Sequence, residues 1–294
     1  MAQQQEAVIS DQNVTVKQTK NTASIVFPKV SQSQRAWKDV LDGLTKWPIW
    51  ALLAYQDIKL RYRRSILGPF WLTLSMAITV YTMGYLYSAI FKMEMASYFP
   101  FLVGGMLSWT LISTCYNELV DSFTSSEGMI KQMKLPYTLY VHRIVFRNML
   151  IFFHNLFVMV PVYVMFHDTV HINFYLLALI PGLLIIYANT AILGLILAML
   201  GGRFRDISQI VKSLIQVVFF ITPVMWKPSA LPPEKAFIVN YNPFASLIEL
   251  IRAPLTGSLP EPGTYAMALG TTLVGMFICW QLFKKYRARI VYWL

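Results

Sequence analysis

The chain lacks the motifs by which many enzymes are recognised. Its 294 residues contain no GxxxxGK(S/T) phosphate-binding loop, no HExxH, no GxSxG and no pair of CxxC motifs. The two cysteines, Cys115 and Cys279, both lie within apolar runs, so we expect neither a structural disulfide nor a thiolate metal site. The histidines are scattered, and His154 is expected to be a hydrogen-bonded structural residue. We therefore expect no intrinsic nucleotide hydrolysis, no metal centre and no cofactor in this chain.

Charge is also scarce. Only 13% of the residues are charged, whereas 56% are hydrophobic, and the mean hydropathy is +0.51. These values are typical of a polytopic membrane protein. The apolar runs lack a pair of ionisable residues near mid-membrane, which disfavours an ion-coupled transporter. The first thirty residues are polar, so we expect no cleavable signal peptide, and residues 1–34 are predicted to form a disordered tail.

The stretch Lys59–Lys92 indicates how the chain enters the membrane. A basic patch is followed by the 27 uncharged residues of Ser65–Phe91. As a helix this run would reach roughly 40 Å, which is enough to cross a hydrocarbon core of about 30 Å. Lys and Arg in short flanks stay on the cytoplasmic side, so the chain should enter from the cytoplasm. The patch consists of Lys59, Arg61, Arg63 and Arg64.

The fold class predicted for residues 35–294 is a single all-α integral membrane domain with six transmembrane helices and both termini in the cytoplasm. Of the 25 Lys and Arg residues, 21 fall on the proposed cytoplasmic side and 4 on the outer side. This asymmetry explains the net charge of +11 by topology, so no nucleic-acid partner is expected. The six spans are predicted at residues 66–91, 96–117, 146–166, 173–200, 207–226 and 264–283.

Two amphipathic segments are predicted on the cytoplasmic side. Residues 35–64 read as an interfacial helix in two pieces broken near Pro48, because tryptophan and aliphatic side chains share one face. The alternative is a surface helix packed on a soluble domain. Residues 123–134 read as a short helix, capped by Thr124 or Ser125, that either docks into a groove on a partner protein or rests on the lipid surface.

Two further polar stretches flank the fifth predicted span. Arg203, Arg205 and Asp206 precede it, and Asp206 can pair with either arginine. This cluster either fixes the topology or has a coupling role. Residues 228–262 follow the span and contain an apolar run too short to cross the membrane. We expect either outer re-entrant helices or an amphipathic periplasmic loop here.

Two predicted spans carry a stripe of aromatic and polar side chains. Such a surface suits sugar rings, whose C–H faces stack on aromatic rings while their hydroxyls form hydrogen bonds. The alternative is the belt of Trp and Tyr that lines the interfaces of many membrane proteins. The candidate residues are Trp71, Ser75 and Tyr85 in the first span, and Gln216, Phe219 and Trp226 in the fifth.

Four stretches, taken in order, resemble one known family. They are RYRRSILGPFW at the first span, SEGMIKQMKLP after the second, GGRFRDI after the fourth, and ITPVMW followed by NYNPF. Together they resemble the permease subunits of polysaccharide-exporting ABC transporters, in the ABC type-2 superfamily. The resemblance begins near Trp47, runs to the C-terminus, and is closest to lipopolysaccharide O-antigen exporters. Capsule and teichoic-acid permeases are relatives.

The resemblance implies a homodimer with two separate ATP-binding subunits, which bind ATP and Mg²⁺. Surrounded by lipid in the bacterial inner membrane, the complex would move a lipid-linked glycan from cytoplasm to periplasm. A drug or small-lipid exporter and a membrane-embedded transferase are the alternatives. The resemblance also assigns Glu127, Met129, Ile130 and Lys131 to a helix coupled to the ATPase. The residues at a cytoplasmic gate or interface would be Arg61, Arg63, Arg64, Arg203, Arg205 and Asp206.

Overall fold

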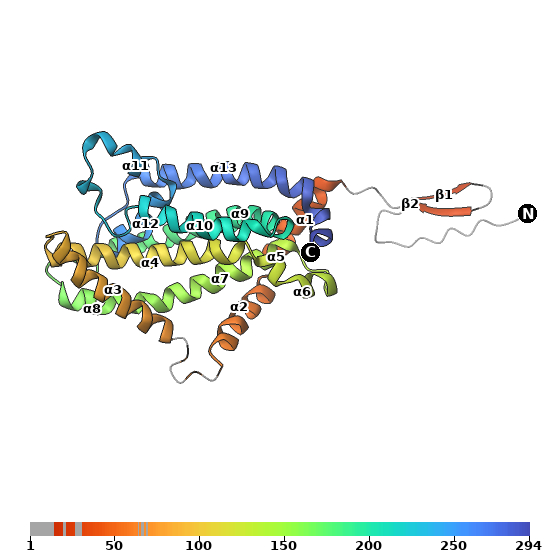
Figure 1. Ribbon diagram of the computed structural model, residues 1–294. Coiled ribbons are helices and arrows are strands. Elements are labelled where there is room, and N and C mark those ends of the chain that lie inside the picture. The colour runs from red at the N-terminus through yellow and green to blue at the C-terminus, as the bar shows by residue number, and fades with distance from the viewer. Residues whose placement is uncertain (1–14, 20–21, 27–30, 64, 66–67, 69) are drawn as a thin grey trace, which may run out of the picture.

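The computed structural model describes residues 15–19, 22–26, 31–63, 65, 68 and 70–294, and it is dominated by helix (Figure 1). Strands β1 (Thr15–Thr19) and β2 (Thr22–Val26) form an antiparallel pair. Most of the tail predicted to be disordered lies outside the described residues.

The helices follow in chain order, with η denoting 3₁₀ segments: α1 (Gln32–Thr45), α2 (Trp47–Arg61), α3 (Phe70–Ile90), α4 (Met95–Leu119), α5 (Ser122–Ser125), α6 (Glu127–Gln132), α7 (Tyr137–Asn155), η1 (Leu156–Val158), α8 (Met159–Met165), η2 (Phe174–Ala178), α9 (Leu179–Arg203), α10 (Asp206–Ile221), η3 (Pro228–Ala230), η4 (Pro233–Lys235), α11 (Phe237–Asn240), α12 (Pro243–Leu255), α13 (Pro262–Tyr286), η5 (Arg287–Arg289) and α14 (Ile290–Trp293). Figure 1 shows α1, α5, α6 and the C-terminus at one end of the bundle, which we call the α6 end, and α8 and α11 at the other.

Four described segments are long and apolar enough to cross a membrane. Two of the six predicted spans are not among them. Helix α3 has 21 residues, but hydroxyl and tyrosine side chains lower its hydropathy, and α10 has only 16 residues. The four segments are Met95–Leu119, Tyr137–Met165, Phe174–Arg203 and Pro262–Trp293.

The structure moves two of the predicted boundaries. Helix α7 begins at Tyr137, before the span predicted from residue 146, so Arg143 lies on the same helix as Arg147. Helix α10 ends at Ile221, where Thr222 adopts an extended backbone before a proline. The residue before a proline disfavours helical geometry, which explains the early stop. Trp226 therefore lies beyond α10 and shares no helical stripe with Gln216 and Phe219.

The predicted interfacial helix is present as the two pieces α1 and α2. A capping box starts α1: the Ser31 hydroxyl accepts from the backbone N–H of Gln34, and the Gln34 side chain accepts from that of Ser31. The break falls at Lys46, and Pro48 sits in the first turn of α2, where its missing N–H removes no helical hydrogen bond. Part of the apolar face is exposed, as the side chain of Trp47 shows.

Helix α4 lies at the centre of the bundle, in contact with α3, α7, α9, α10 and α12. Helix α9 can approach α4 closely because glycines of α9 face α4. A Cβ on Gly201 of α9 would lie 2.1 Å from the carbonyl oxygen of Val120, and one on Gly194 would lie 2.4 Å from the Leu119 side chain. Small residues let helix backbones approach closely in membrane proteins, so these positions bring α9 against the end of α4.

Polar contacts join the helices inside the bundle. The Tyr116 hydroxyl of α4 donates to Asn189 Oδ1 of α9 (2.6 Å), and Asn189 Nδ2 donates to Thr272 Oγ1 of α13 (2.9 Å). On the short buried helix α12, Arg252 is only 4% exposed. Its guanidinium pairs with Glu249, donates to the Pro223 carbonyl (2.6 Å), and lies 4.0 Å above the ring of Phe101. These polar groups are thus satisfied within the protein, as an apolar surrounding requires.

Candidate functional site

The segment predicted at residues 123–134 connects α4 to α7 at the α6 end. Glu127 Oε1 and Lys131 Nζ of α6 lie 2.6 Å apart, an i,i+4 ion pair with both side chains about half exposed. Ile130 is buried, and Met129 packs partly buried against the core. One face of α6 is therefore anchored in the protein, while its charged face is available to a partner.

The details of this segment differ from the prediction. It consists of two helices, α5 and α6, which meet at Ser126, rather than one. Neither Thr124 nor Ser125 caps a helix. Both lie inside α5, where the Thr124 hydroxyl donates to the Asp121 carbonyl and the Ser125 hydroxyl to the Ser122 carbonyl. An N-cap side chain must precede the first turn and accept from it, and these two residues come too late.

The junction of α9 and α10 lies near the C-terminal residues. The Arg203 guanidinium carbon lies 5.4 Å from the Trp293 ring centroid and 5.9 Å from that of Tyr286, which are cation–π distances. Arg205 and Asp206 are exposed. Contrary to the predicted pairing, the ion pairs found among the described residues include none between Asp206 and either arginine.

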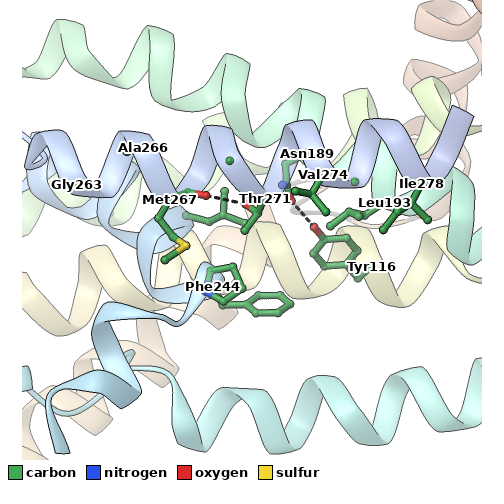
Figure 2. A pocket seen from close by; sticks show the side chains of 14 residues that line it. Tyr116, Asn189, Leu193, Phe244, Gly263, Ala266, Met267, Thr271, Val274 and Ile278 are labelled. Atoms are coloured by element: carbon green, nitrogen blue, oxygen red, sulfur yellow. Dashed lines mark hydrogen bonds between the residues drawn. The ribbon is translucent and has the colours of Figure 1, made fainter.

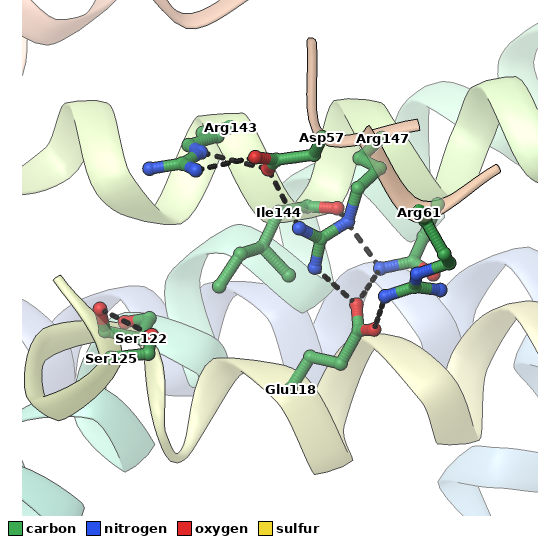
Figure 3. A network of polar contacts seen from close by, with 9 residues as sticks. Asp57, Arg61, Glu118, Ser122, Ser125, Arg143, Ile144 and Arg147 are labelled. Atoms are coloured by element: carbon green, nitrogen blue, oxygen red, sulfur yellow. Dashed lines mark hydrogen bonds and ion pairs between the residues drawn. The ribbon is translucent and has the colours of Figure 1, made fainter. Parts of the chain in front are cut away.

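An ion-pair network that the sequence analysis did not foresee joins three helices near the α6 end (Figure 3). Asp57 of α2 accepts from Arg143 Nε (2.8 Å) and from an Arg147 terminal nitrogen (2.7 Å), both on α7. Glu118 of α4 accepts from Arg147 (2.7 Å) and from Asn148 Nδ2 (2.6 Å).

One residue of the predicted basic patch joins this network. Arg61 of α2 lies 3.2 Å from the second carboxylate oxygen of Glu118. Arg63 is exposed. Arg64 lies outside the described residues. Asp57 therefore attaches α2 to α7, and Arg61 attaches α2 to α4.

Electrostatics support the charged state of this network. Burial acts to raise the pKa of the Asp57 carboxyl, but hydrogen bonds and positive charge from Arg143 and Arg147 outweigh burial and hold the pKa below its usual range. No short sequence motif predicts this network, because its five charged residues lie on three helices that are far apart in the chain. The only local signal is charge at the ends of neighbouring apolar runs.

The candidate glycan-path residues do not form one continuous surface in this chain. Trp71 and Tyr85 of α3 and Gln216 of α10 are exposed, and both helices pack against α4. Ser75 lines a cavity of about 340 Å³ between α3, α4 and α7. Phe219 instead packs against the ring of Trp109, at a centroid distance of 5.4 Å. The Trp226 indole donates to the Phe220 carbonyl.

A cavity of about 680 Å³ lies between α4, α9, α12 and α13 (Figure 2). Phe244, Met267 and Val274 give it an apolar wall, and the Tyr116–Asn189 hydrogen bond lies at one side. Its lining includes no carboxylate, histidine or cationic side chain. Across the described chain, no group of three His, Cys, Asp or Glu side chains could hold a metal ion.

Long apolar helices, short helices at one end and a buried polar network define a multi-pass membrane protein rather than an enzyme built around a catalytic cluster. Residues 49–255 match the model of the ABC-2 type transporter family, and the chain belongs to that family. Its members are transmembrane subunits of ABC exporters and not themselves ATPases. The absence of a phosphate-binding loop is consistent with this role.

Individual relatives agree with the resemblance. O-antigen export system permease protein RfbA of Klebsiella pneumoniae is 22% identical over 207 residues, which cover 67% of this chain and 76% of that protein. The protein of the same name from Myxococcus xanthus is 25% identical, covering 68% and 77%. Polysialic acid transport protein KpsM of Escherichia coli is 23% identical over 236 residues, covering 79% and 91%.

Replacing Asp57 by Asn should destabilise the protein at neutral pH by about 1–2 kcal/mol, less than for a fully buried ion pair, because solvent partly screens these charges. Because the pKa of Asp57 is lowered, its stabilisation is present above the ordinary value of 3.8 and is lost as pH falls through the folded-state pKa. Thermal unfolding in detergent should therefore show a gap between Asp57→Asn and the unaltered protein that narrows below pH 3.8. Asp168→Asn, at a side chain 88% exposed, is the control. A gap of constant size across this range would contradict the interpretation.

Proposed function

We propose that this chain is the channel-forming permease subunit of an ATP-driven exporter. Its substrate is a lipid-linked polysaccharide of the O-antigen type, moved from the cytoplasm to the periplasm across the bacterial inner membrane. The observation that carries the proposal is the geometry of α6. Its charged face is exposed at the α6 end, while Ile130 and Met129 on its other face pack into the protein, in a chain that belongs to the ABC-2 type transporter family.

The assembly consists of two copies of this chain and two ATP-binding subunits, which hold ATP and Mg²⁺. Helix α6 lies between α4 and α7 in the chain, so a push on α6 acts on two long helices at once. Its exposed Glu127–Lys131 pair supplies the charged surface for docking. The exposed Arg205 and Asp206, and Arg203 beside them, form a second part of the same cytoplasmic interface.

The topology comprises six crossings, with α3 and α10 added to the four long segments. Helix α12 enters the outer leaflet and returns, because its 13 residues span about 20 Å, too little to cross. Its buried Arg252 is satisfied by protein groups, which supports a re-entrant position. The 21-to-4 division of Lys and Arg supports cytoplasmic termini.

Reporter fusions test this topology. A fusion after Lys235 should report the periplasm, and fusions after Lys134 and Leu294 should report the cytoplasm, because α10 must cross to carry Lys235 outward. A fusion after Asp168 serves as the periplasmic reference. A cytoplasmic signal at Lys235 would mean that α10 does not cross, and the six-crossing arrangement would have to be abandoned.

The coupling role of α6 is tested by exchanging its two charges. Glu127→Lys combined with Lys131→Glu keeps an i,i+4 ion pair in α6 but inverts the charge pattern that a partner meets. We expect surface glycan to fall at least tenfold and the ATP-binding subunit to co-purify poorly, while membrane abundance is unchanged. The matched control, Glu127→Asp with Lys131→Arg, keeps both signs and should export normally. Normal export by the charge exchange would favour a helix that rests on the lipid surface.

The glycan path is proposed along the exposed aromatic and polar side chains of α3 and α10. Tyr85 is 72% exposed, so Tyr85→Ala should reduce export severely without lowering the amount of protein in the membrane. Tyr98 is fully buried, so Tyr98→Ala should cost about 3–5 kcal/mol of packing and lower abundance itself. Surface glycan is measured beside membrane abundance for both variants. A parallel fall of both quantities in Tyr85→Ala would identify Tyr85 as a packing residue. Trp71 and Gln216 are the other exposed candidates, and Ser75 lines the neighbouring cavity, whereas Phe219 and Trp226 are only partly exposed and would border the path.

A capsular polymer is the second candidate substrate. The match to the polysialic acid transport protein extends over 91% of that protein, compared with 76% for an O-antigen permease. Deleting the gene and staining both surface polymers separates the two. Loss of capsule with intact O-antigen would assign the capsular substrate.

A further inference from the structure

An apolar cavity of about 370 Å³, which we call the α1 cavity, lies where helix α1 meets the bundle. Helices α1, α7, α9 and α13 all contribute to its lining, and it is separate from the cavity of Figure 2. Its volume lies within the range of roughly 300–1,000 Å³ that is usual for small-molecule sites. The described residues that line it include no Lys, Arg, Asp or Glu, so its occupant needs an apolar body.

The α1 cavity opens on the outside of the bundle. Trp37 and Leu44 of α1 and Met276 of α13 line it and are exposed. The rings of Trp37 and Trp280 meet edge to face there, at a centroid distance of 6.0 Å. Tryptophan is enriched where the hydrocarbon of a bilayer meets the lipid headgroups. In a membrane protein, the apolar group that surrounds such an opening is the acyl chain of a lipid.

Basic side chains gather at the α6 end of this cavity, where Figure 1 shows α1 beside the last turns of α13. Helix α1 and residues 284–289 together carry six basic and two acidic side chains. The ion pairs found among the described residues include only one of these cations, Arg287, which pairs with the buried carboxylate of Asp39 at 2.7 Å. Basic pockets between transmembrane helices attract anionic lipid headgroups. The six basic residues are Arg35, Lys38, Lys284, Lys285, Arg287 and Arg289, and the two acidic residues are Asp39 and Asp42.

We propose that the α1 cavity binds an acyl chain of an anionic phospholipid, whose phosphate lies against Lys38 and Lys284. Lys38 directly follows Trp37 in α1, and Lys284 lies one helical turn beyond Trp280 in α13, so the two amino groups flank the pair of indole rings. The lipid belongs to the cytoplasmic leaflet, a placement that rests on the topology proposed above.

This phospholipid is a resident of the protein and not the transported substrate. The proposed glycan path follows α3 and α10, and neither helix contributes a residue to the lining of the α1 cavity. The lipid instead fills the space between α1 and the bundle. Because Asp39 of α1 accepts from the backbone N–H of Thr138 (3.2 Å), in the first turn of α7, the lipid supports the seating of α1 on the helix that follows α6.

Tryptophan fluorescence with brominated lipids tests this proposal, because bromine on an acyl chain quenches a tryptophan that the chain touches. The purified subunit is placed in phosphatidylcholine nanodiscs that contain a variable fraction of phosphatidylglycerol or phosphatidylcholine with brominated chains. We expect half-maximal quenching at a fraction of brominated phosphatidylglycerol about tenfold lower than that of brominated phosphatidylcholine, as two lysines near one anionic headgroup predict. This preference should disappear from the fluorescence when Trp37→Phe and Trp280→Phe are combined.

Charge variants test the headgroup contact. Lys38→Gln and Lys284→Gln should each weaken the preference for phosphatidylglycerol about fivefold, the effect of one basic residue near an anionic lipid surface. The matched control is Lys235→Gln, because the proposed topology places Lys235 on the outer side. That variant should keep the full preference.

A second pair of variants tests the acyl-chain contact. Ala191 lines the α1 cavity, so Ala191→Phe should fill it and remove the preference for phosphatidylglycerol. Ala266→Phe fills the cavity of Figure 2 instead and should behave like the unaltered protein. The lysine variants leave the lining of the cavity intact, so they keep the test valid if Ala191→Phe lowers the melting temperature.

Three results would overturn the proposal. They are equal quenching by the two brominated lipids, a preference that survives both lysine substitutions together, and displacement of phosphatidylglycerol by an equal or smaller fraction of a polyprenyl phosphate, which would assign the cavity to the lipid of the substrate. Absence of any quenching at Trp37 and Trp280 would show that protein covers the cavity, and it would overturn the proposal as well. The assay uses neither ATP-binding subunits nor glycan, so its failure leaves the export proposal in place, and a failure of export leaves the lipid preference measurable.

Discussion

The arrangement of the bundle depends on the burial of α4. Helices α3, α7, α8, α9, α10 and α12 contact it, and 15 of its 25 residues are buried. Lipid is as apolar as a leucine side chain, so apolar character alone does not draw helices together in a membrane. Close packing of the backbones and buried hydrogen bonds must hold the helices together instead. At Gly194 and Gly201 the backbone of α9 approaches α4 within distances that leave no space for a methyl group. The Tyr116–Asn189–Thr272 chain of hydrogen bonds then joins α4 to α9 and α13.

The ion-pair network extends this attachment to the predicted interfacial helix. Asp57 and Arg61 of α2 reach the arginines of α7 and the glutamate of α4, so α2 is held to the same two helices that flank α5 and α6. A displacement of α6 is therefore opposed by α2 as well as by the bundle. This is a physical basis for treating α2, α4, α6 and α7 as one mechanical unit at the α6 end.

Local patterns in the sequence predicted the local structure well. The existence of the four long apolar segments depends on run length, and it is confirmed. The third span was predicted to begin at residue 146, whereas α7 begins at Tyr137, because the partners that satisfy Arg143 lie on a distant helix and leave no signal in the sequence. The end of α10 was placed too late because the apolar run continues past Ile221, whereas the backbone turns extended before Pro223. Long-range pairing leaves no signal in one sequence, which is why the network emerges only from the structure.

The paired and unpaired charges at the α6 end have different consequences. Arg143, Arg147 and Lys212 are neutralised by carboxylates of the same chain, so they contribute little net field toward lipid or a partner. Arg63 and Arg205 are exposed, and their positive charge contributes to the electrostatic field that lipid or a partner meets. A simple count of basic residues treats both groups alike, although the first holds helices together and the second faces outward. Removing an exposed arginine therefore alters surface potential with little cost to folding, whereas removing Arg147 takes one partner from Asp57 and one from Glu118 and so weakens the attachment of α7 to both α2 and α4.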